Sequence, residues 1–66
     1  MQITVNGEST ELPEGATAQG LVELLKLTGR RLAMEVNGEI VPRSQHATRT
    51  LATGDRIEIV HAVGGG

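Results

Sequence analysis

Hydrophobic and polar residues alternate along the first part of the chain, as they do in strands with one buried face. Residues 2–5 place Ile3 and Val5 on one side, and the Asn6-Gly7 pair that follows is a strong signal for a two-residue hairpin turn. The expected return strand, residues 8–12, is only weakly apolar. This composition predicts a strand at the edge of a sheet, which ends at the Pro13-Glu14-Gly15 turn.

The same pattern recurs in the second half of the chain. Residues 32–36 alternate, Asn37-Gly38 predicts a second hairpin turn, and residues 39–41 form the return strand before Pro42. Residues 43–51 show no period, so we expect a loop with one turn of helix. Thr53-Gly54-Asp55 predicts a tight turn that precedes a last strand up to residue 63.

Between the hairpins, the spacing of apolar residues changes to that of a helix. Thr17 is a suitable N-cap, and the predicted helix covers residues 18–28, with Leu21, Leu24, Leu25 and Thr28 on one buried stripe. Gly29 is expected to end it at the C′ position.

This order of elements predicts an α+β fold: a mixed sheet of four to five strands with one helix packed on one face, which is the β-grasp (ubiquitin-like) arrangement. Because a long connection through a helix suits a parallel neighbour, the last strand is expected beside the first and parallel to it. Residues 1–63 would form the domain, and residues 64–66 a flexible glycine tail. The expected core consists of Ile3, Val5, Leu21, Leu24, Leu25, Met34, Val36, Val41, Leu51, Ile57 and Ile59.

The composition excludes several classes of function but does not identify one. The 66 residues contain no cysteine and no aromatic residue, so an aliphatic core must stabilise a small domain. A net charge of −2 with interspersed signs gives no footprint for nucleic acid or an anionic membrane. No stretch has the length of a membrane span or the pattern of a signal peptide. We therefore expect a cytoplasmic protein that is a monomer when free.

The terminal Gly64-Gly65-Gly66 run contributes nothing to a core and is costly to order. It would instead offer a bare carboxylate on a thin arm that reaches about 10 Å beyond the last strand. Val60 and Ala62, on the outward side of that strand, form a candidate docking patch for whatever receives the arm. A chemically idle, frayed end is the alternative interpretation.

Three segments together resemble the ubiquitin-like sulfur carriers, and most closely the ThiS family of thiamine biosynthesis. They are the opening MQITVNGE, the VNGEIVPR segment at residues 36–43, and the ending GDRIEIVHAVGGG at residues 54–66. The resemblance spans the whole chain, although its ending carries one glycine beyond the minimal pair, so Gly64 is a spacer and Gly65-Gly66 the functional pair on this interpretation.

The resemblance implies that the chain is not an enzyme but a co-substrate. An E1-like (ThiF-like) adenylating enzyme would use ATP to activate the Gly66 carboxylate, and a cysteine persulfide donor would convert it into a thiocarboxylate. Thiazole synthase (ThiG-like) would then receive the sulfur. Gly64 and Gly65 would serve in recognition of the tail, and no cofactor would be bound permanently.

Other functions remain open on the residues alone. Delivery of sulfur to molybdopterin, attachment to target lysines and a plain interaction module all fit a β-grasp domain, although a single lysine, Lys26, disfavours polymers built on the chain itself. His46 and His61 have no cysteine to complete a zinc site, so no metal is expected. Scattered arginines are ordinarily solvated, and this is the first interpretation of Arg30, Arg31 and Arg43. The alternative is that they contact an acidic surface of a partner.

Overall fold

The computed structural model describes residues 1–61, and the predicted tail and the predicted domain boundary after Val63 lie outside them. Within this range, the chain forms five strands, one α-helix and one short 3-10 helix. In order these are β1 (Gln2–Val5), β2 (Glu8–Glu11), α1 (Ala18–Leu24), β3 (Leu32–Val36), β4 (Glu39–Val41), η1 (Arg43–Gln45) and β5 (Arg56–His61).

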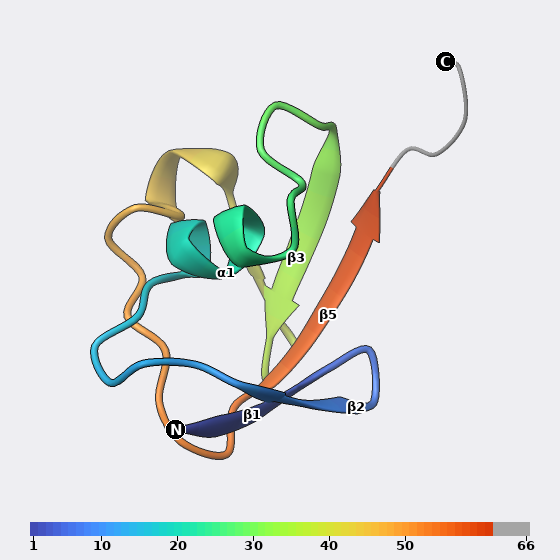
Figure 1. Ribbon diagram of the computed structural model, residues 1–66. Coiled ribbons are helices and arrows are strands. Elements are labelled where there is room, and N and C mark those ends of the chain that lie inside the picture. The colour runs from blue at the N-terminus through green and yellow to red at the C-terminus, as the bar shows by residue number, and fades with distance from the viewer. Residues whose placement is uncertain (62–66) are drawn as a thin grey trace.

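The five strands make one mixed sheet in the order β2-β1-β5-β3-β4, with α1 on one face (Figure 1). β5 is central: it runs parallel to β1, with Val5 opposite Ile57, and antiparallel to β3, with Met34 opposite Ile59. The hairpins β1–β2 and β3–β4 meet only through β5. The β-grasp arrangement and the position of the last strand are therefore confirmed.

Both Asn-Gly pairs form the turns that the sequence predicts. Asn6 and Gly7 have φ of 51° and 85°, and Asn37 and Gly38 have φ of 53° and 86°. Positive φ at both central residues defines the type I′ turn, whose twist matches that of the flanking strands.

The helix begins as predicted but ends earlier. The Thr17 hydroxyl accepts the Gly20 N–H at 3.1 Å, which confirms the N-cap. At the other end α1 stops at Leu24, because Lys26, with φ of 60°, occupies the C′ position that the sequence assigned to Gly29. The Lys26 N–H donates to the Glu23 carbonyl and the Leu27 N–H to the Val22 carbonyl, both at 3.0 Å. These two bonds are a Schellman motif, and they turn Leu27 back against the core.

This early end changes which helical residues are buried. Leu24 is 54% exposed and Thr28 is exposed, so both assignments to the buried stripe are wrong, while Leu25 is only half-buried. The remaining nine residues of the expected core are buried. Within residues 1–61, four further residues are buried that were not predicted: Leu12, Ala18, Val22 and His46.

His46 is buried because its ring has a partner. The predicted turn of helix in the 43–51 loop exists as η1, and His46 follows it with its Nε2 3.0 Å from the Val41 carbonyl oxygen. A buried polar ring with a hydrogen bond costs far less than one without, so this histidine packs as a core residue. In the part of the chain described, no helix is long and apolar enough to cross a membrane.

Candidate functional site

The candidate site lies at the carboxyl end of β5, the strand that leads to the terminal glycines. Of the five residues that the sequence singled out, Val60 lies within the described range, whereas Ala62, Gly64, Gly65 and Gly66 lie outside it. Val60 is 73% exposed, so its predicted outward orientation on β5 is confirmed. His61, the next residue, is half-buried on the opposite face.

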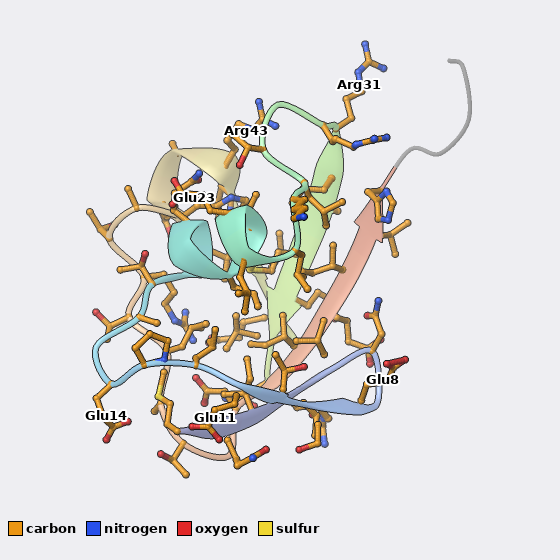
Figure 2. The ribbon with its side chains drawn as sticks, in the orientation of Figure 1. Glu8, Glu11, Glu14, Glu23, Arg31 and Arg43 are labelled. Atoms are coloured by element: carbon orange, nitrogen blue, oxygen red, sulfur yellow. The ribbon has the colours of Figure 1, made fainter. Side chains whose placement is uncertain are left out.

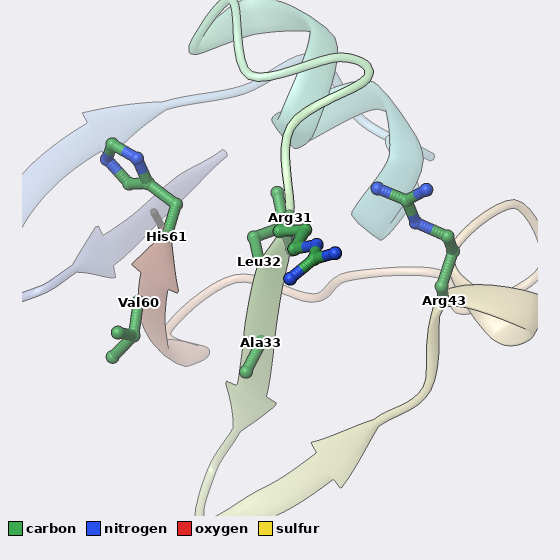
Figure 3. Close-up of a pocket in the computed structure, with 6 residues that line it drawn as sticks. All are labelled: Arg31, Leu32, Ala33, Arg43, Val60 and His61. Carbon is green, nitrogen blue, oxygen red and sulfur yellow. The ribbon is translucent and has the colours of Figure 1, made fainter. Parts of the chain in front are cut away.

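A pocket of about 520 Å³ adjoins this strand end (Figure 3). The antiparallel pairing of β3 and β5 builds one side of it, because Ala33 lies opposite Val60 and Leu32 opposite His61. Ala33 and Val60 are both exposed, so they add an apolar floor on the outer face of the sheet. Arg31, Leu32, Ala33, Arg43, Val60 and His61 line the pocket.

Two arginines from different parts of the chain flank this pocket. Arg31 directly precedes β3, and Arg43 opens η1 after β4 (Figure 3). Arg43 Nη2 donates to the Arg30 carbonyl oxygen at 2.6 Å, so the loop before β3 and the segment after β4 are held together. The two arginines are twelve positions apart in the sequence, and only the fold brings them to the same pocket.

Asparagine side chains from both turns hold the central strand. Asn6 Nδ2 donates to the Ile59 carbonyl oxygen at 3.0 Å, and Asn6 Oδ1 accepts the Ile59 N–H at 2.8 Å. The amide thus continues the ladder of β1 onto β5 for one more residue after the strand itself has turned away. Asn37 acts on the other side, where its Oδ1 accepts the Arg56 N–H at 2.9 Å and its Nδ2 donates to Asp55 Oδ1 at 2.9 Å.

We did not predict this anchoring role for either asparagine from the sequence. The available signal was that both halves of the chain carry the same Val-Asn-Gly-Glu segment, at residues 5–8 and 36–39. The type I′ turns explain why each asparagine has a left-handed backbone. Only the order of strands in the sheet explains why both asparagine side chains reach β5. Together the two amides position the strand from which the terminal residues continue.

The described residues offer little other chemistry. Among residues 1–61, no group of three or more His, Cys, Asp or Glu side chains is close enough to hold a metal ion. His46 is buried in the core. The geometry is that of a surface that presents a strand end, with an apolar floor and two flanking cations.

These features define the chain as a β-grasp domain of the ubiquitin-like type, whose last described strand, β5, is the central one. Its sequence matches the model of the ThiS family over residues 2–66, and the chain therefore belongs to that family.

Relatives with known names agree with this membership. The sulfur carrier protein ThiS of Escherichia coli is 33% identical over 66 residues, which is the full length of both chains. Thiazole synthases of Paramagnetospirillum magneticum and Magnetococcus marinus are 38% and 36% identical over 66 residues. The chain spans only 20% of the length of each of these synthases. The crystal structure of the thiamine biosynthesis protein ThiS from Geobacter metallireducens matches with a TM-score of 0.82 at 30% identity, over the whole of both chains.

Proposed function

We propose that this protein carries sulfur as a thiocarboxylate on Gly66 and delivers it for formation of the thiazole ring in thiamine biosynthesis. The observation that carries the proposal is the similarity to the Escherichia coli sulfur carrier over the full length of both chains, which includes the terminal glycines. Two thiazole synthases that contain a region similar to the whole chain support the choice of pathway. The protein would act in the cytoplasm, as a co-substrate rather than a catalyst.

A carboxylate is a poor electrophile, so the first step must activate it. The Gly66 carboxylate attacks the α-phosphorus of ATP on a ThiF-like adenylating enzyme, and pyrophosphate leaves. The terminal sulfur of a partner's cysteine persulfide then attacks the acyl carbon, and AMP leaves. A second partner thiol breaks the S–S bond, which leaves a disulfide on the partner and a thiocarboxylate on Gly66. A ThiG-like thiazole synthase accepts the sulfur.

The residues of this chain supply presentation. Gly64 and Gly65 carry no Cβ, so they suit a narrow channel in which a side chain would clash. Val60 and Ala62 would dock against the partner beside that channel. The exposure of Val60 and its pairing with Ala33 support this role, because they give the partner a small apolar surface next to the arm.

The test is the intact mass of the chain after incubation with ATP, a ThiF-like enzyme and a sulfur donor. We expect the mass to rise by the replacement of one oxygen by sulfur, and the product to support thiazole formation by a ThiG-like synthase. One alanine appended after Gly66 should abolish the change, and Gly65→Val should strongly reduce it. Both variants should unfold at the temperature of the parent chain, because the changes lie beyond the last strand.

A chain with the appended alanine that gains sulfur without being trimmed would refute the role of Gly66. Full activity of Gly65→Val would refute a narrow channel. Attachment to lysines of other proteins, visible as a higher-mass conjugate in the same reaction, would instead favour the modifier function.

A further inference from the structure

Two arginines gather at one end of this domain. Arg31 and Arg43 lie at the end where β5 terminates, with Glu23 of α1 not far from Arg43, whereas Glu8, Glu11 and Glu14 lie farther from that end (Figure 2). The chain as a whole is acidic, with a net charge of −2. An acidic protein surface would therefore be attracted to this pair of arginines rather than to the domain as a whole.

The two arginines are not used to stabilise the fold through ion pairs. Within residues 1–61, the ion pairs join the N-terminal ammonium group to Glu11 and Glu14, and neither Arg31 nor Arg43 takes part in one. Arg43 uses one N–H donor in its hydrogen bond to the Arg30 carbonyl oxygen. A guanidinium group carries five N–H donors in a rigid fork, so both side chains keep donors that a carboxylate from outside can accept.

The neighbourhood of these arginines resembles the centre of a protein interface. The pocket that they line has an apolar floor of Ala33 and Val60, and arginine beside apolar side chains is typical of interface hot spots. The same pocket includes His61, the last described residue before the arm. Whatever contacts this pocket therefore contacts the residue after which the arm begins in the sequence.

We propose that Arg31 and Arg43 form a docking site for carboxylates of the adenylating partner, which we expect to surround the mouth of the channel that receives the arm. This inference rests on the proposed function. Attraction over a Debye length of about 8–10 Å orients the domain with its arginine end, and so with the carboxyl end of β5, toward the partner before contact. The partner is thus a protein with an acidic surface, and its carboxylates bind the arginines directly in the complex.

The test measures the association rate with a ThiF-like enzyme at several salt concentrations, without ATP or a sulfur donor. Because this chain has no Trp, Tyr or Phe, the partner's own tryptophan fluorescence can report the encounter. The variant combines Arg31→Gln with Arg43→Gln. The matched control combines Arg49→Gln with Arg56→Gln, which removes the same charge away from the pocket.

We expect the association rate of the pocket variant to fall about tenfold at low salt and to depend less on salt, whereas the control changes less than about twofold. Lysine at both pocket positions should keep most of the rate, since it keeps the charge. Circular dichroism should show that every variant is folded. Sulfur transfer at saturating enzyme should proceed in the parent chain and in the Arg49/Arg56 control, so failure of that reaction in the parent chain would count against the proposed function alone.

Three results would overturn the docking site. Equal slowing of the pocket variant and the control would reduce the effect to net charge, and no slowing of either would remove the attraction. Binding of ATP alone to the parent chain, lost in the pocket variant, would show that the arginines hold phosphate rather than protein carboxylates.

Discussion

Replacing Asn6 by glycine tests whether a single side-chain amide anchors the central strand. Asn6 has a φ of 51°, and glycine adopts this left-handed conformation without strain, so the turn should survive. What the change removes is the pair of hydrogen bonds to the backbone of Ile59, at 2.8 and 3.0 Å.

The expected loss follows from those two bonds. Each contributes about 0.5–1.5 kcal/mol to stability, and glycine recovers a few tenths up to about 1 kcal/mol by relieving the left-handed conformation. The residue whose backbone loses its partner is 5% exposed, so water replaces the amide poorly. The free energy of unfolding should therefore fall by about 1–2 kcal/mol.

Urea unfolding followed by far-ultraviolet circular dichroism measures this loss, since the chain has no aromatic residue for fluorescence. Hydrogen exchange of the Ile59 amide should also accelerate. Asn37→Gly is the matched control, because it keeps the same type of turn but removes exposed bonds, and it should cost less than about 1 kcal/mol. Equal losses in the two variants would show that the partly buried bonds of Asn6 stabilise no more than the exposed bonds of Asn37, and unchanged stability and exchange at Ile59 would show that the amide of Asn6 does not anchor β5.

Three further changes test the core, the helix end and the outer face. Ile59→Ala should lower the free energy of unfolding by about 2–4 kcal/mol and Glu58→Ala by less than about 0.5 kcal/mol, and similar urea midpoints would place β5 in the wrong register. Lys26→Gly should raise the free energy of unfolding by about 1 kcal/mol, and with it the thermal midpoint, because glycine suits the C′ position; a lower midpoint would contradict the Schellman motif. Val60→Asp should weaken titrated binding to both the adenylating enzyme and the thiazole synthase while stability changes by less than about 0.5 kcal/mol; unchanged affinity for both would exclude it from the interface.

Much of the fold was predictable because its strands and turns depend on local signals. Alternation and the two Asn-Gly pairs specify the hairpins, and the central place of β5 follows from the long connection that a parallel neighbour of β1 needs. The end of the helix was not predictable from its period. Partial burial of Leu27 against the core stabilises the chain reversal at Lys26, which needs a left-handed backbone. This tertiary contact outweighs both the helical spacing of apolar residues and the preference for glycine at the C′ position.

The candidate site divides in the same way. The glycine ending and the outward Val60 are visible in the sequence, because the first is a matter of residue type and the second of alternation. The juxtaposition of Arg31 and Arg43 depends on how two loops meet, and the role of Asn6 depends on the order of strands. Neither has a local signature, since each arises from contacts between segments far apart in the chain.

The central position of β5 also has a consequence for the order of folding during synthesis. The ribosome makes β5 last of the five strands, yet the two hairpins pair with each other only through it. Until β5 emerges, neither hairpin has a neighbouring strand in the sheet, and a two-stranded hairpin by itself is marginally stable in water. The five-stranded sheet can therefore be completed only after β5 is made, and a nascent chain interrupted before Arg56 lacks the strand that joins its two hairpins.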